Sequence, residues 1–113
     1  MNKISVENLA VIGKVFKTFP LFDGDSKVND KVSMGIAVFA PGSRAPPKEE
    51  EYASHDGDEF AYFISGSLKC CSGGEVFELK AGDASFIPAG EAHYSWNETD
   101  QPCTLIYFLI KKD

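Results

Sequence analysis

Residues 55–66, HDGDEFAYFISG, and residues 82–97, GDASFIPAGEAHYSWN, are the two most strongly patterned stretches of the chain. In the first, a histidine and a glutamate stand four positions apart, just ahead of an apolar run. The second carries the only other histidine of the sequence. Both histidines therefore lie in the segments that are most informative about the fold.

Short β-strands separated by glycine turns are predicted around these stretches. Strands of about five residues, spaced about eight to twelve residues apart, are typical of an all-β sandwich or barrel. No helix of ten or more residues is signalled. The expected strands cover residues 31–39, 59–65, 67–71, 75–79, 84–87, 93–97 and 104–110.

The remaining segments are expected to be irregular. Residues 2–19 favour short extended pieces over a helix. Pro20 and the polar run 23–26 predict a loop, and the two prolines and three glutamates of residues 43–58 predict a second, long and acidic one. Gly35 lies inside a strand pattern and indicates a bulge or a close backbone approach. Gly66 and Gly82 are interpreted as turn residues that need a permissive backbone.

Alternation along the strands places the two histidines and one carboxylate on inward faces. Glu59 shares its face with Ala61 and Phe63, opposite Phe60, Tyr62 and Ile64, while His93, Ser95 and Asn97 share another. If the two strands pair, His55, Glu59 and His93 converge and suit one divalent transition metal ion, namely iron, manganese, nickel, copper or zinc. From the residues alone, hydrogen-bonded core histidines are an equally open interpretation.

Composition restricts the class of protein. A chain of 113 residues predicts one domain over residues 1–113, and a formal charge of −6 argues against a nucleic-acid partner. The sequence begins without a leader pattern and contains no membrane-length apolar run, so we expect a cytoplasmic protein with no membrane partner. Three cysteines without C-x-x-C spacing predict reduced, partly buried thiols.

The two stretches resemble the motifs of the cupin family. Gly82, Pro88, Gly90, His93 and Asn97 match every position of the second motif, in about residues 82–97. His55, Glu59 and Gly66 match part of the first motif, in about residues 42–66. The resemblance implies a double-stranded β-helix, or jelly-roll barrel, whose motif residues line an internal pocket. In this family homodimers commonly form through an outer sheet.

The first motif departs from the family pattern. The family's first histidine position falls on Ala53, which cannot bind a metal, and ten residues separate Ala53 from Gly42 where the family usually has five. The four family ligands are thereby reduced to His55, Glu59 and His93. Two alternatives stay open: three protein ligands with water, or an acidic loop, residues 49–52, that folds over the empty position.

The resemblance does not name a reaction, because the family hosts many. One hypothesis is a metal-binding cupin that acts on a small polar metabolite by oxygenase, isomerase or lyase chemistry. Glu59 and Tyr107 are the candidate catalytic residues, although the face that Tyr107 takes is open. The alternatives are a non-enzymatic module that binds a small ligand at a degenerate metal site, and a scaffold whose pocket is filled by side chains. The expected partners are a small molecule and a second copy of the chain.

Overall fold

The computed structural model describes residues 1–23 and 28–112. In that part of the chain there are nine strands and no helix, and so no helix that could cross a membrane. The strands are β1 (Phe16–Phe22), β2 (Val32–Phe39), β3 (Arg44–Ala45), β4 (Gly57–Ser65), β5 (Ser67–Ser72), β6 (Glu75–Lys80), β7 (Ala84–Ile87), β8 (His93–Trp96) and β9 (Cys103–Lys111).

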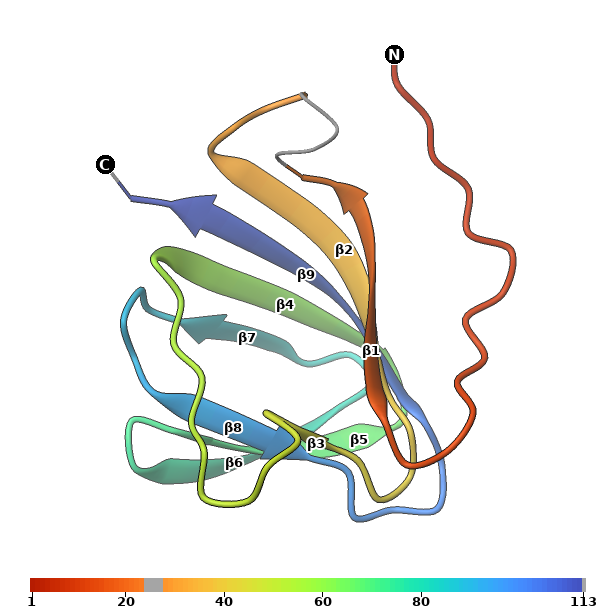
Figure 1. The fold of residues 1–113 in the computed structure, drawn as a ribbon, viewed down its shortest axis with the longest axis vertical. Helices are drawn as coiled ribbons and strands as arrows, with labels where there is room; N and C mark the ends of the chain where they lie inside the picture. The colour runs from red at the N-terminus through yellow and green to blue at the C-terminus, as the bar shows by residue number, and fades with distance from the viewer. Residues whose placement is uncertain (24–27, 113) are drawn as a thin grey trace.

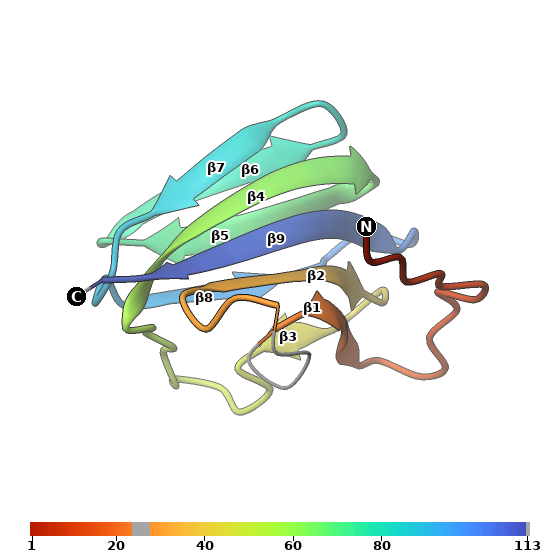
Figure 2. The same ribbon diagram turned by 90° about the horizontal axis from the view of Figure 1, so that it is seen from above.

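The strands form two antiparallel sheets that face each other. One sheet has the order β1-β2-β9-β4-β7 and the other the order β3-β8-β5-β6. Figure 1 shows the sheets as an upper and a lower layer, and Figure 2 shows the long strands β4 and β9 running side by side. The expected all-β jelly-roll fold is confirmed.

Strand β4 has the predicted two-residue alternation. Ala61 and Phe63 are buried, whereas Phe60, Tyr62 and Ile64 are between 41% and 52% exposed. The inward face packs in a core cluster between the sheets. Its buried members are Ala37, Phe39, Ala61, Phe63, Leu68, Cys103 and Leu105. Cys70, Cys71 and Cys103 are all free and buried, as expected.

Two of the expected loops contain strand residues. Pro20 lies inside β1 rather than in a loop, because β1 is an edge strand and its register with β2 shifts between Pro20 and Phe22. An edge strand with an irregular register tolerates a residue that has no N–H to donate. Residues 24–26 of that predicted loop lie outside the described residues. The acidic loop contains the two-residue strand β3, which pairs with β8 at another sheet edge.

Asn97 closes one end of the barrel, as a turn residue should. It is 1% exposed, and its side-chain amide donates to the carbonyl oxygens of Phe39 (2.9 Å) and Gln101 (2.8 Å). Its side-chain oxygen accepts from the backbone N–H and the hydroxyl of Thr99. Asn97 therefore ties the end of β2 to the 97–101 turn and does not face the cavity.

Candidate metal centre

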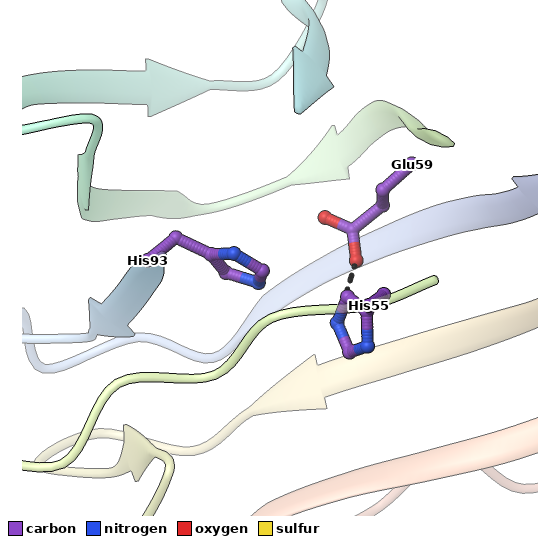
Figure 3. A group of neighbouring side chains, drawn as sticks. All are labelled: His55, Glu59 and His93. Atoms are coloured by element: carbon purple, nitrogen blue, oxygen red, sulfur yellow. Dashed lines mark ion pairs between the residues drawn. The ribbon is translucent and has the colours of Figure 1, made fainter. Parts of the chain in front are cut away.

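His55, Glu59 and His93 lie together inside the barrel. One potential ligand atom from each lies within 4.8 Å of the others, and no other such group occurs among the residues that the structure describes. Figure 3 shows His93 reaching in from the start of β8, Glu59 from β4, and His55 from the segment before β4. The two motif strands, whose pairing the sequence left open, do not pair, because β4 and β8 belong to different sheets. The three side chains meet across the barrel instead.

Backbone hydrogen bonds hold the two motif segments against each other. Ala53 and His93 exchange two of them, with N···O distances of 2.8 and 2.9 Å. Gly90 N–H donates to the carbonyl oxygen of His55 at 2.8 Å, and Ala89 N–H donates to the Asp58 carboxylate at 2.9 Å. The backbone carrying His55 is thus fixed relative to the backbone carrying His93, although the segments are distant in sequence.

The tautomer of His93 follows from its contact with the backbone of Glu91. Its Nδ1 lies 2.9 Å from the carbonyl oxygen of Glu91. A carbonyl oxygen only accepts, so Nδ1 must carry the proton, and in the neutral ring Nε2 then has a free lone pair. The His93 side chain is 7% exposed and lines the cavity. Orientation of a metal-binding imidazole by a backbone carbonyl is usual in metalloproteins.

His55 and Glu59 form the more accessible side of the cluster. The His55 Nε2 atom lies 3.6 Å from the Glu59 Oε1 atom, and the side chains are 38% and 22% exposed. Figure 3 marks this contact with a dashed line. Two imidazole nitrogens and one carboxylate are a donor set that fits a divalent first-row transition metal and leaves coordination positions open for water or substrate.

The cluster lines a cavity of about 340 Å³ between the sheets. Phe63, on the same face of β4 as Glu59, forms part of the wall together with Phe39, Leu68 and Leu105. Sequence reasoning missed the hydroxyls of Thr18 and Ser85, which also line the cavity. Both belong to strands whose inward face could have been identified only after the register was known.

Tyr107 also faces the cavity, which answers the question left open by the sequence. Its ring lies over Gly35, where a Cβ atom would be only 2.8 Å from Tyr107 Cε1. The expected close approach at Gly35 is therefore real. The Tyr107 hydroxyl interacts with the Thr18 side chain, and burial, followed by the negative charges of Asp23 and Glu59, raises its pKa. The hydroxyl is consequently protonated at neutral pH and able to donate a hydrogen bond.

The acidic loop does not supply a ligand. Residues 49–52 are exposed and do not belong to the cluster. The Arg44 guanidinium holds this loop by donating to the carbonyl oxygens of Pro46, Lys48 and Glu51, and it lies 4.6 Å from the centre of the Tyr94 ring. Ala53 lines the cavity, so the position assigned to the missing histidine faces the site.

A family model described as a cupin domain matches residues 35–109. The chain belongs to the cupin family. A search of curated proteins found no significant match.

Solved cupin structures share the fold. A protein from Thermus thermophilus has 22% identity and a TM-score of 0.72, with 96% of this chain and 98% of that chain covered. A predicted oxalate decarboxylase from Thermotoga maritima has 21% identity and a TM-score of 0.72, with coverages of 86% and 81%. A sugar phosphate isomerase from Silicibacter pomeroyi has 21% identity and a TM-score of 0.67, with coverages of 86% and 60%. At these identities the similarity establishes the fold alone.

Proposed function

We propose that this cupin binds one divalent transition metal ion through His55, Glu59 and His93 and acts on a small polar metabolite in the adjoining cavity. The observation that carries the proposal is the convergence of three potential ligand atoms within 4.8 Å at the wall of that cavity. The reaction would be of the oxygenase, isomerase or lyase type. Relatives described as an isomerase and as a predicted oxalate decarboxylase are consistent with such chemistry.

Each side chain has a distinct role in this proposal. His93 presents Nε2 because Glu91 holds the proton on Nδ1. His55 must be deprotonated to bind, so metal affinity falls as the pH is lowered. Glu59 supplies negative charge, and the protonated Tyr107 hydroxyl can donate a hydrogen bond to a substrate oxygen. A bound ion would contribute Lewis acidity, which polarises a carbonyl or carboxylate.

The test is elemental analysis by plasma mass spectrometry of untagged protein purified without chelator, together with the His93→Ala variant. We expect near-stoichiometric metal in the wild type and loss of that metal in the variant. Ser95→Ala is the matched control, because Ser95 lines the same cavity from the same strand but is not part of the cluster. Equal metal content in His93→Ala and wild type would exclude the assignment.

A non-enzymatic module that binds a small ligand is the second candidate function. Ala53 favours it, because the position that faces the site at the first-histidine place of the motif has no donor atom. This candidate predicts that a chelator leaves ligand affinity unchanged. Loss of ligand affinity on chelation would favour the metal-dependent function.

We further propose a homodimer located in the cytoplasm. The outer face of the five-stranded sheet exposes Phe60, Tyr62, Ile64, Phe86 and Ile110. An apolar face of this kind is characteristic of a protein interface. The free, buried cysteines are consistent with a reducing compartment.

A further inference from the structure

The polar groups of the cavity are concentrated at one end. Along β4, Glu59 pairs with Ile87 and Leu109, whereas Phe63, four residues further along, pairs with Leu105. At roughly 3.3 Å per residue, these two levels are about 13 Å apart. The cluster of His55, Glu59 and His93 therefore lies at the level of Glu59, and the level of Phe63 is mainly apolar, with Thr18 as a polar member of that row.

The level between them is mixed. Ala61 pairs with Ser85 on one side and with Tyr107 on the other. The polar groups here include the hydroxyl of Ser85 and that of Tyr107, which also interacts with the Thr18 side chain. Beyond this level most of the lining side chains are apolar, among them Ala37, Phe39, Leu68 and Leu105, while Thr18, which pairs with Ala37, adds one hydroxyl. A ligand that extends from the cluster into the barrel therefore has one end beside His55, Glu59 and His93 and the other end among mainly apolar side chains.

A second anionic group on a ligand would find no counter-charge. No lysine or arginine is among the described residues that line the cavity. Arg44 is nearby in sequence, but its guanidinium is used by the loop carbonyl oxygens and the Tyr94 ring. Glu59 adds a negative charge at the polar end. Burying a second charge without a partner would cost binding free energy.

The cavity also limits the size of the ligand. An engineered cavity of about 150 Å³ holds benzene, which has six non-hydrogen atoms. The cavity of about 340 Å³ in this barrel is about twice as large, so it would hold a ligand of on the order of a dozen non-hydrogen atoms.

We infer that the site takes a small monocarboxylate with an apolar aliphatic or aromatic body, the carboxylate at the metal cluster and the body between Phe39, Phe63 and Leu105. This inference rests on the proposed metal-binding function for the head group. It narrows the metabolite of that proposal to one with a single anionic group, and it distinguishes this chain from the relatives named for oxalate and for a sugar phosphate.

The test uses zinc-loaded protein and measures dissociation constants for butanoate, hexanoate and octanoate by calorimetry. Burial of each methylene group should tighten binding about fourfold, so octanoate should bind about two orders of magnitude tighter than butanoate. Oxalate and glucose 6-phosphate should bind more weakly than octanoate. No dependence on chain length, or tighter binding of oxalate or glucose 6-phosphate, would overturn the inference.

A variant pair locates the apolar body. Ala61→Leu fills the cavity and should weaken octanoate binding at least tenfold while leaving zinc content unchanged. Ala84→Leu makes the same change on the exposed face of the adjacent strand and should change neither octanoate affinity nor zinc content. Unchanged octanoate affinity in a folded Ala61→Leu protein contradicts the inference, and if that variant does not fold, the chain-length series on the wild type decides.

Two measurements distinguish failure of the metal site from failure of the inference about the apolar body. Zinc content is measured first, and toluene is then added to metal-free protein. If zinc is absent but toluene shifts the methyl NMR signals of Ala61 and Leu105, the proposed metal function fails and the apolar half of the inference is supported. If zinc binds but neither chain length nor toluene has an effect, the metal function stands and the inference fails.

Discussion

Ala53 and His93 face each other across two reciprocal backbone hydrogen bonds, of 2.8 and 2.9 Å, at the wall of the cavity. Ala53, whose side chain has no atom that could bind a metal, therefore lies directly beside His93, whose imidazole has one. A side chain at position 53 is therefore already positioned to join the cluster.

Ala53→His should tighten metal binding by at least tenfold, because it adds a fourth donor at a backbone position that is already fixed. Zinc affinity measured by competition with a chromophoric chelator would show the gain. Ser54→His, at the neighbouring exposed position, is the control and should leave the affinity unchanged. If the two variants behave alike, position 53 is not the first-histidine position.

Asn97→Ala should destabilise the fold by about 2–4 kcal/mol, because it removes two donated hydrogen bonds and leaves the buried Phe39 carbonyl oxygen without its Asn97 donor. Urea unfolding followed by Trp96 fluorescence would measure the loss. Asp100→Ala, in the same turn but exposed, should change stability by less than about 0.5 kcal/mol. A loss below 1 kcal/mol in Asn97→Ala would contradict this role.

Stability should fall at alkaline pH through Cys103. Burial raises the pKa of its thiol from 9.0 to about 11. The unfolded chain then loses this proton at lower pH than the folded one, so the contribution to stability is full below about pH 9 and is lost as the pH rises to about 11. A pKa raised from 9.0 to about 11 corresponds to roughly 2–3 kcal/mol in the free energy of unfolding. Urea unfolding at pH 8 and pH 10.5, with reductant, should show a smaller pH effect in Cys103→Ala than in wild type. Parallel pH profiles in the two proteins would exclude this source.

Gly35→Ala should cost about 1–3 kcal/mol, because the new Cβ would overlap the Tyr107 ring. Tyr107→Leu should recover part of that loss when the two changes are combined. A double-mutant cycle by thermal unfolding measures this coupling. Additive effects would mean that the cost of Gly35→Ala does not arise from overlap with the Tyr107 ring.

Phe60→Glu should convert the proposed homodimer into a monomer, because it places a charge in the centre of the exposed apolar face. The Phe60 and Phe86 rings lie with centroids 5.0 Å apart on this face. Light scattering after size exclusion gives the mass. Phe77→Glu is the matched control on β6 of the other sheet, where Phe77 is 44% exposed. Dissociation by the control instead would move the interface to that sheet.

The sequence was most informative where the structure is local. The alternation of Glu59 to Ile64 depends on neighbouring residues, and it is found as predicted. The position of His93 opposite Glu59 depends on which sheet each strand joins, and spacing does not encode that. Strand β3 was missed because two residues before a proline pair carry no strand pattern, and Pro20 was misassigned because an edge position is a property of the whole sheet.

The hydrogen bonds between residues 53–58 and residues 88–93 are formed mainly by backbone N–H and C=O groups. Every amino acid except proline has both groups. The scaffold therefore specifies positions rather than donors. We therefore expect the side chains at positions 53, 55 and 93 to be exchangeable one at a time while the backbone of the two segments keeps its place. Such a framework keeps a side chain at position 53 facing the cavity whichever amino acid stands there, and so offers an engineered route to a different coordination chemistry.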